Sequence, residues 1–393
     1  MKVFYTVSQV PAHSVLLMPT REQAVSYPKG DIELALCNQC GFMGNIAFEQ
    51  ELNDYSLKYD GSQSWSPTFN VFNRKLAQGL VERYDLHNKD IIEIGCGQGE
   101  FLILLCELGD NRGIGFDPAF GGVGYDPEQE AMRLREVSKD RITLVSDFYS
   151  EKYTHVQADF VVCKMTLEHI PQTAEFISMV RRSIGDRFDT TVFFQVPNAS
   201  YVLNDLAFWD IYYEHCNYFS RGSLGYLFEQ CGFEVLSTAT EYNEQYLTIE
   251  ARPKRLAQVN DSAAIQANWQ VLIDEGKQEV AAFISRITPQ LQQWHARLAA
   301  IQTQNQQAVI WGGGSKGVAF LTTLQANGIV GYAVDVNPHK HGTFMAGSGH
   351  EIVGPQKLLT YRPDVVIVMN PVYCNEIQRE LNEMGLHPAM IAV

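Results

Sequence analysis

The chain has 393 residues, 46% of them hydrophobic and 19% charged, so we expect two or three compact units rather than one domain. Forty-five acidic and thirty basic side chains give a formal charge of −15, which repels a phosphate backbone and argues against nucleic acid as a partner. No long apolar stretch suggests a membrane span, and the first residues lack the apolar core of a signal peptide. These features predict a soluble, cytoplasmic protein that acts on a small molecule.

Residues 1–68 are turn-rich, with Pro and Gly between short β-like runs such as the one from Asp31 to Leu36. We interpret them as a small N-terminal lobe. Among the eight cysteines only Cys37 and Cys40 form a paired motif, so a secreted disulfide framework is not expected.

Residues 69–255 are predicted to form an α/β domain. From Phe69 to Tyr84 apolar residues recur every four positions, which is helical spacing. Strand-like and helical segments then alternate, which indicates a doubly wound, mostly parallel sheet with helices on both faces. The expected strands are Ile91–Ile94, Gly113–Phe116, Ile142–Val145, Phe160–Cys163 and Thr191–Val196, followed by a helix at Ser220–Cys231 and a terminal hairpin.

Residues 256–304 are rich in Ala and Gln with helical periodicity, and Pro289 predicts a break into two bridging helices. Residues 305–393 then repeat the α/β pattern. Their expected strands are Ala308–Trp311, Val330–Val334 and Val365–Met369. This unit is predicted to be a second, Rossmann-like domain.

A glycine-rich loop follows the first strand of the 69–255 unit, with the sequence Glu93-Ile94-Gly95-Cys96-Gly97-Gln98-Gly99. Glycines there allow a tight turn and a close approach of the backbone to a ligand at the carboxyl edge of the sheet. A glycine-rich turn without a ligand is the alternative. Because the loop has an acidic residue and no Lys, it suits a cationic sulfonium amino acid better than a pyrophosphate.

Acidic residues at the next two strand ends favour a nucleoside ligand. Asp117 ends the second strand, where a carboxylate can accept both ribose hydroxyls, and Asp147-Phe148 follow the third, where they can bracket an adenine. In this order the elements resemble those of class I S-adenosylmethionine (SAM)-dependent methyltransferases. The resemblance implies SAM as cofactor and a cofactor site formed by Glu93, Gly95, Cys96, Gly97, Gly99, Asp117, Asp147, Phe148 and Cys163.

Cys163 opens a segment that is similar to the loop after the fourth strand in this family. The segment contains Glu168-His169, a pair that can bind a metal. We favour a structural role for the pair.

An aromatic segment from Phe208 to Ser220 lies between the fifth strand and a capped helix, at the sheet edge expected to hold the cofactor. His215 in this segment can act as a general base when neutral, and Glu214 can set its tautomer. Tyr212 can donate a hydrogen bond to a developing oxyanion. Asn198 and Tyr218 are further candidates for the substrate pocket, whereas the alternative is that the aromatic cluster is core.

The stretch from Tyr212 to Ser220 resembles the Glu-His-x-x-Tyr-Phe-Ser segment of C-methyltransferases that act on nucleotide-linked ketosugars. The resemblance covers nearly the whole chain, because those enzymes also have a small N-terminal lobe and a C-terminal Rossmann-like domain. It implies that His215 removes the proton next to a ketone, with help from Tyr212 and support from Glu214. Tyr59 corresponds to a family tyrosine that reaches the site from the N-terminal lobe.

Members of that family carry two Cys-x-x-Cys pairs in the N-terminal lobe, enough for a structural zinc site. This chain has only Cys37-Asn-Gln-Cys40. We therefore favour no metal in the lobe. Zinc is the alternative, with Cys37 and Cys40 as candidate ligands and His13 as a possible third.

A second glycine loop, Gly312-Gly-Gly314-Ser315-Lys316-Gly317, lies between a strand and a helix, and Asp335 closes the next strand. This spacing is typical of a dinucleotide site and keeps open an NAD-binding oxidoreductase or a nucleotide-sensing module. Resemblance to the sugar methyltransferases implies instead that Gly312, Gly314, Ser315, Lys316 and Asp335 bind the substrate's nucleotide diphosphate. An O- or N-methyltransferase is the remaining alternative.

Overall fold

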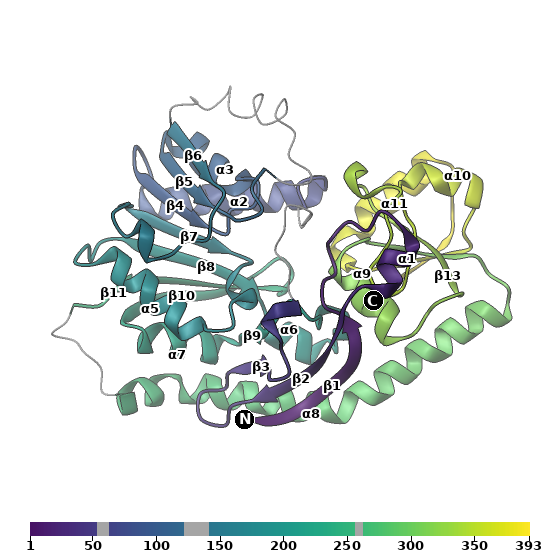
Figure 1. The fold of residues 1–393 in the computed structure, drawn as a ribbon, viewed down its shortest axis with the longest axis horizontal. Coiled ribbons are helices and arrows are strands. Elements are labelled where there is room, and N and C mark those ends of the chain that lie inside the picture. The colour runs from purple at the N-terminus through teal and green to yellow at the C-terminus, as the bar shows by residue number, and fades with distance from the viewer. Residues whose placement is uncertain (53–62, 122–140, 256–261) are drawn as a thin grey trace.

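The computed structural model describes residues 1–52, 63–121, 141–255 and 262–393. Within these ranges the strands form sheets of four, seven and five strands. In Figure 1 the seven-stranded sheet lies on the left and the C-terminal α/β unit on the right, while the long helix α8 (Ser262–Thr303) runs along the lower edge. The N-terminal strands lie between the two α/β units.

The seven-stranded sheet has the order β10-β11-β8-β7-β4-β5-β6. All neighbouring pairs are parallel except those that involve β11, which runs antiparallel to β8 and β10. The strands are β4 (Asp90–Ile94), β5 (Arg112–Phe116), β6 (Ile142–Val145), β7 (Phe160–Lys164), β8 (Thr191–Pro197), β10 (Phe233–Glu241) and β11 (Tyr246–Pro253). The predicted strands and terminal hairpin are confirmed with small differences at their ends.

Two hydrophobic clusters cover the two faces of this sheet, because alternate strand residues point to opposite sides. On one face α2 (Pro67–Tyr84) and α3 (Glu100–Gly109) contribute buried residues such as Leu80 and Leu102. On the other face α5 (Thr173–Ile184) and α7 (Arg221–Gln230) contribute Val180 and Phe228. The sheet is therefore doubly wound, as predicted.

The C-terminal sheet is entirely parallel, in the order β14-β13-β12-β15-β16. Its strands are β12 (Ala308–Trp311), β13 (Val330–Val334), β14 (Ile352–Val353), β15 (Val365–Val368) and β16 (Ala389–Ala392). Helix α9 (Ser315–Thr323) follows β12, α10 (Leu358–Tyr361) precedes β15, and α11 (Cys374–Glu383) follows β15. This arrangement agrees with the predicted Rossmann-like unit.

The N-terminal lobe is more regular than the sequence suggested. Its strands β1 (Lys2–Pro11), β2 (Lys29–Leu36) and β3 (Met43–Asn45) form an antiparallel sheet, and the short helix α1 (Arg21–Ser26) lies between β1 and β2. The sheet is completed by β9 (Asn217–Tyr218), which comes from the aromatic segment that follows β8. Pairing of Met43 with Tyr218 thus anchors the His215 segment to the lobe.

The expected break at Pro289 is wrong, because α8 continues through it for 42 residues. Packing along the helix outweighs the local cost of the proline: Ile273, Phe283 and Trp294 are all buried. At its N-terminal half α8 lies close to α7, where a Cβ at Gly225 would be 2.2 Å from the Trp269 ring. One continuous helix therefore connects the two α/β units.

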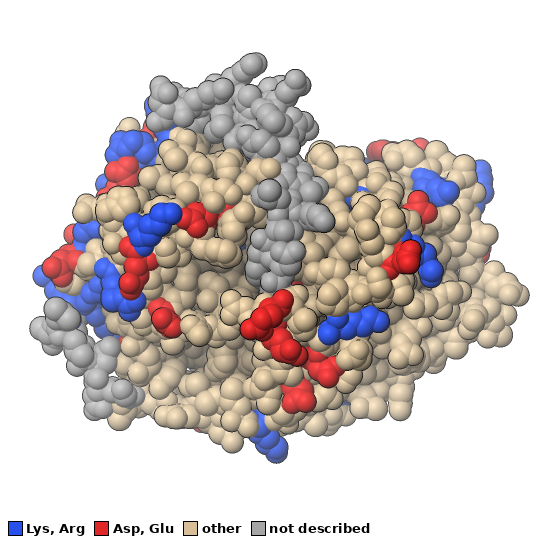
Figure 2. Space-filling view, in the orientation of Figure 1, with Lys and Arg blue, Asp and Glu red and all other residues tan. Residues whose placement is uncertain are grey.

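On the face in Figure 2, Lys and Arg lie in small groups among Asp and Glu, and they form no continuous basic stripe. No helix in the described part of the chain is long and apolar enough to cross a membrane.

Candidate active site

The first glycine loop joins β4 to α3 at the carboxyl edge of the seven-stranded sheet. Gly95, Gly97 and Gly99 all have positive φ angles, of 71°, 57° and 82°, which is the conformation that favours glycine. A Cβ at Gly95 would lie 2.0 Å from Thr166 Oγ1, in the loop after β7. The glycine thus lets the two loops that border the expected SAM site approach each other closely.

Glu93 and Asp117 end the neighbouring strands β4 and β5. Glu93 is 2% exposed, and its Oε2 accepts no hydrogen bond from any residue that the structure describes. Burial raises the pKa of this carboxyl to about 8, although Lys164 opposes the change. Asp117 Oδ2 accepts the Gly97 N–H at 2.8 Å, and burial raises the pKa of Asp117. An orphaned carboxylate oxygen beside the glycine loop suits the cationic amino-acid end of SAM.

Asp147 and Phe148 lie at the same sheet edge, after β6. Asp147 already accepts hydrogen bonds from Lys152 Nζ, Tyr153 Oη and the Phe148 N–H, and the Lys152 contact holds its pKa near 2. The Phe148 ring is 62% exposed, so it is accessible to a ligand. Their placement at this edge agrees with the sequence-based assignment, but no contact here tests it.

Cys96 and Cys163, also predicted at the cofactor site, are buried at 6% and 0% exposure. A Cβ at Gly115 would be 2.7 Å from Cys96 Sγ, so this thiol packs into the sheet. The Cys163 side chain belongs to the hydrophobic cluster under α5 and α7. Both thiols are core groups, and a bound ligand could meet these residues only through their backbone.

A cavity of about 280 Å³ lies between the seven-stranded sheet and the C-terminal domain. One wall is formed by the segments that follow β7 and β8, and the opposite wall by the second glycine loop. Its lining includes Glu168, His169, Tyr212, Glu214, His215, Gly312, Gly314, Ser315, Lys316 and Asp335. The structure therefore brings the predicted base and the predicted diphosphate loop into one cavity.

His215 and Tyr212 lie side by side at the cavity wall, with ring centroids 4.1 Å apart and ring planes tilted by 43°. His215 is 4% exposed, and its Nδ1 has no hydrogen-bond partner within the described ranges. Burial, with smaller contributions from His169 and Lys316, lowers the pKa of His215 well below its usual value. Burial also raises the pKa of Tyr212. A neutral imidazole thus lies beside a protonated phenol, the states needed to accept and to donate a proton.

Glu214 contacts residues other than His215 in the structure, and its support of His215 stays a prediction. Glu214 Oε1 accepts the backbone N–H and the hydroxyl of Ser14 at 2.6 and 2.5 Å, and lies 3.2 Å from His13 Nδ1. Ser14 Oγ also lies 2.7 Å from Ser315 Oγ in the second glycine loop. Glu214 therefore connects the N-terminal lobe to the diphosphate loop.

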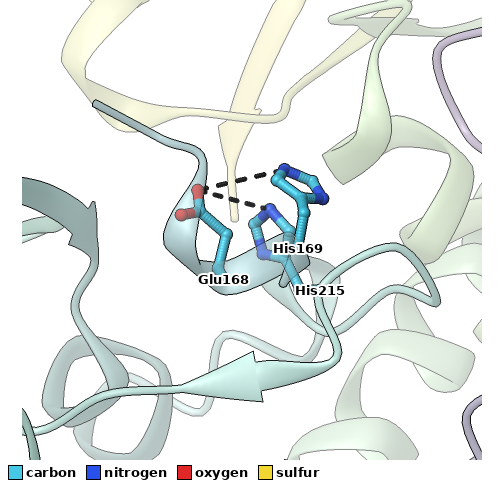
Figure 3. A group of neighbouring side chains, drawn as sticks. All are labelled: Glu168, His169 and His215. Atoms are coloured by element: carbon cyan, nitrogen blue, oxygen red, sulfur yellow. Dashed lines mark ion pairs between the residues drawn. The ribbon is translucent and has the colours of Figure 1, made fainter. Parts of the chain in front are cut away.

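Glu168 is the carboxylate that faces His215. Its Oε1 lies 3.9 Å from His215 Nε2 and 4.0 Å from His169 Nε2 (Figure 3). Glu168 is 1% exposed, and burial raises its pKa to about 8. Burial lowers the pKa of His169 to about 4. In the sequence only the Glu168-His169 pair after a strand points to this group of side chains. Its proximity to His215 arises from the fold and could not be predicted locally.

The remaining candidate residues are Asn198, Tyr218 and Tyr59. Asn198 caps α6 (Ala199–Asn204) by accepting the Ser200 N–H, and its amide donates to the Glu244 carbonyl. These contacts give Asn198 a structural role, and its predicted substrate role stays a prediction. Tyr218 is buried in β9, with its ring 6.4 Å from that of His215. Tyr59 lies outside the described residues.

The second glycine loop joins β12 to α9. Gly312 has a φ of 127°, and Gly314 precedes the first turn of α9. Asp335 accepts the Gly313 N–H at 3.0 Å and pairs with Lys340 Nζ at 3.1 Å. Lys316 extends into the cavity from the first turn of α9 and pairs with Asp210. A helix N-terminus with a neighbouring Lys is suited to a phosphate group.

Cys37 and Cys40 lie at the end of β2 and in the turn that follows. Within the described ranges no third Cys, His, Asp or Glu joins them in a group that could hold a metal. Both cysteines are partly exposed free thiols.

Two protein families match the chain in succession. Residues 70–238 match a family described as methyltransferase domain, and residues 253–388 match one described as C-methyltransferase C-terminal domain. The chain is also 25% identical over 375 residues to the C-methyltransferase NovU of Streptomyces niveus, covering 90% of this chain and 84% of that protein.

Solved structures resemble about half of the chain. The 1,6-didemethyltoxoflavin-N1-methyltransferase of Burkholderia thailandensis, with bound S-adenosylhomocysteine, is 13% identical over 48% of this chain and 82% of its own, with a TM-score of 0.35. Magnesium protoporphyrin IX methyltransferase from Synechocystis PCC 6803 is 16% identical over 48% and 84%, with a TM-score of 0.36.

The doubly wound sheet, its glycine loop and the family match over residues 70–238 define a SAM-dependent methyltransferase. The predictions of enzyme class and of SAM as cofactor are confirmed. Residues 253–388 are in addition similar to the C-terminal domain of C-methyltransferases. Neither family supports the alternative of an NAD-dependent oxidoreductase.

Proposed function

We propose that the enzyme transfers a methyl group from SAM to a carbon next to the ketone of a nucleotide-activated sugar. The observation that carries the proposal is the shared cavity, where Tyr212 and His215 face the glycine loop that contains Lys316. A sugar linked to a diphosphate needs a base beside its sugar and a cation beside its diphosphate, and this cavity contains both. The C-terminal domain type and the relative NovU add support for carbon as the methylated atom.

Carbon must become a nucleophile before it can accept the methyl group. In the proposed reaction neutral His215 removes a proton from the carbon next to the ketone, and the Tyr212 hydroxyl donates a hydrogen bond to the enolate oxygen. When bound, SAM supplies an electrophilic methyl group on its sulfonium. The new carbon–carbon bond forms as the carbon–sulfur bond breaks, and His215 keeps the abstracted proton until product release.

The diphosphate end requires positive charge and backbone donors. Lys316 provides the charge, and the first turn of α9 provides N–H groups directed at the cavity. Glu93, with its orphaned oxygen, and Asp117 are proposed to bind the amino group and the ribose of SAM. These assignments follow from position and chemistry in the described residues.

Deuterium exchange tests the mechanism. A nucleotide-linked ketosugar is incubated in deuterated water with enzyme and S-adenosylhomocysteine, so that deprotonation occurs without methyl transfer. We expect deuterium at the carbon next to the ketone with the wild-type enzyme, and an exchange rate at least about 100-fold lower with His215→Gln. Methylation without His215-dependent exchange would instead indicate an O- or N-methyltransferase.

A further inference from the structure

A buried carboxylate at the back of the cavity, that of Glu168, lacks the contacts that such a group normally makes, and two imidazoles lie beside it. Neither oxygen of Glu168 accepts a hydrogen bond from another residue that the structure describes, although the side chain is 1% exposed. Buried carboxylates are normally hydrogen-bonded, paired with a cation or protonated. The Nε2 atoms of His169 and His215 lie 4.0 and 3.9 Å from Glu168 Oε1.

These distances are too long for direct hydrogen bonds but suit an ion held between the three groups. The three candidate ligand atoms all lie within 4.8 Å of one another. A point equidistant from atoms spaced in this way is roughly 2.3 to 2.5 Å from each, compared with about 2.0 to 2.2 Å for zinc bound by His and Glu. Small rotations of the side chains would close the difference. In Figure 3 both rings and the carboxylate are directed toward this common point.

The tautomer of His169 is favourable for metal binding. Its Nδ1 lies 3.0 Å from the backbone carbonyl of Glu214, which can only accept a hydrogen bond. Nδ1 therefore carries the proton, and the lone pair is on Nε2, the atom nearest Glu168. A ring N–H that donates to a carbonyl is the usual outer contact of a histidine that ligates a metal.

We propose that Glu168, His169 and His215 bind one divalent transition-metal ion of the zinc or cobalt class, and that the bound ion prevents His215 from acting as a base. Two imidazoles and one carboxylate favour such ions over magnesium or calcium, which prefer oxygen ligands. A lone pair on Nε2 that is donated to a metal cannot accept a proton. Metal and substrate proton therefore compete for the same imidazole.

The second part of this proposal depends on the proposed function, whereas the binding site itself does not. Binding is measured on the full-length protein after treatment with a chelator and buffer exchange, without substrate. Co²⁺ is titrated and followed by its visible absorption, which reports nitrogen ligands, and Zn²⁺ is titrated against a chromophoric indicator. We expect one equivalent at this site, with an affinity at least about tenfold lower in Glu168→Gln and in His169→Gln.

Two controls keep the test decisive. The double variant Cys37→Ser/Cys40→Ser removes the other candidate ligands and should retain this equivalent, with its affinity unchanged. Circular dichroism and SAM binding establish that Glu168→Gln and His169→Gln are folded. Absence of binding to the wild-type protein, or equal binding by folded Glu168→Gln and His169→Gln proteins, would overturn the site.

The effect on the base is read from deuterium exchange. The exchange rate should fall in proportion to the bound Zn²⁺ and recover when a chelator is added. A rate that rises with bound metal would overturn the competition, because His215 would then not be the group that the ion blocks. If no ketosugar shows exchange, the proposed function fails while the binding measurement still decides the site.

Discussion

Lys316 Nζ lies 2.6 Å from Asp210 Oδ2, so the cation of the second glycine loop is paired with the aromatic segment that contains His215. Gln245 Oε1, at 3.3 Å, is a second acceptor for the same ammonium. A diphosphate that enters the cavity must therefore compete with Asp210 for Lys316. This relationship links recognition of the distant end of the substrate to the segment that carries the base.

We predict that Lys316→Met weakens the binding of a nucleoside diphosphate such as UDP by about 10- to 100-fold, the value of one charge-assisted hydrogen bond. Asp210→Asn should have the opposite effect and tighten binding several-fold, because it removes the competing carboxylate. Isothermal titration calorimetry measures both. Equal affinities for wild type and Lys316→Met would remove Lys316 from the proposed diphosphate site.

Tyr212→Phe should lower the rate of deuterium exchange by about 10- to 100-fold, because the enolate oxygen loses a hydrogen-bond donor. The ring remains, so its contact with His215, at a centroid distance of 4.1 Å, should be preserved. SAM affinity, measured by calorimetry, should not change. If the exchange rate is unaffected, the Tyr212 hydroxyl does not contact the reacting oxygen.

Gly95→Ala and Gly97→Ala form a matched pair at the SAM loop. Both positions have positive φ, but a Cβ at Gly97 has no neighbour closer than 4.0 Å, whereas one at Gly95 would clash with Thr166. We expect a loss of about 1 to 2 kcal/mol of stability for Gly97→Ala from backbone strain. Gly95→Ala should lose about 1 to 3 kcal/mol more from overpacking.

Urea denaturation measures these two losses, and calorimetry should show that Gly95→Ala also has the lower affinity for SAM. Equal losses of stability in the two variants would mean that the loop after β7 moves to accommodate the new side chain.

Glu93 should make stability depend on pH. Its pKa is raised to about 8 by burial, so the folded protein keeps a proton that the unfolded chain loses at about pH 4.5. The stability that this proton contributes is present below about pH 4.5 and is lost as the pH rises to about 8. Wild type should therefore lose stability relative to Glu93→Gln between pH 5 and 8.

Urea denaturation at pH 5, 6.5 and 8 tests this expectation. Glu82→Gln, at an exposed position on α2, removes the same charge and serves as the control. A difference between wild type and Glu93→Gln that stays constant over this range would contradict the assigned burial effect.

Local signals in the sequence account for most of both α/β units. Strands such as Ile142–Val145 and Ala308–Trp311 were predicted with their observed ends, because short apolar runs between turn residues need no distant information. The glycine loops were equally clear, since positive φ angles at Gly95 and Gly97 are required by the local turn. The sequence therefore located the glycine loop at the edge of the sheet.

Contacts between distant segments are what the sequence does not predict. Glu214 is expected beside its neighbour His215, but in the fold it meets Ser14, which is 200 positions away in the chain. For Glu168 the local pattern indicates only a structural loop, whereas the fold brings its carboxylate to 3.9 Å from His215 Nε2. The continuity of α8 at Pro289 likewise depends on the core against which the helix packs. No pattern of neighbouring residues in the sequence indicates these distant contacts.

The unbroken α8 has a consequence for which acceptors fit. A helix of 42 residues is about 60 Å long, and it has no joint at which the two α/β units could change their separation. Its C-terminal half is fixed to the C-terminal domain by contacts such as Trp294 with Phe320, whose ring centroids are 5.0 Å apart. Under the proposed function, this fixed separation selects acceptors by the distance between their diphosphate and the carbon that is methylated.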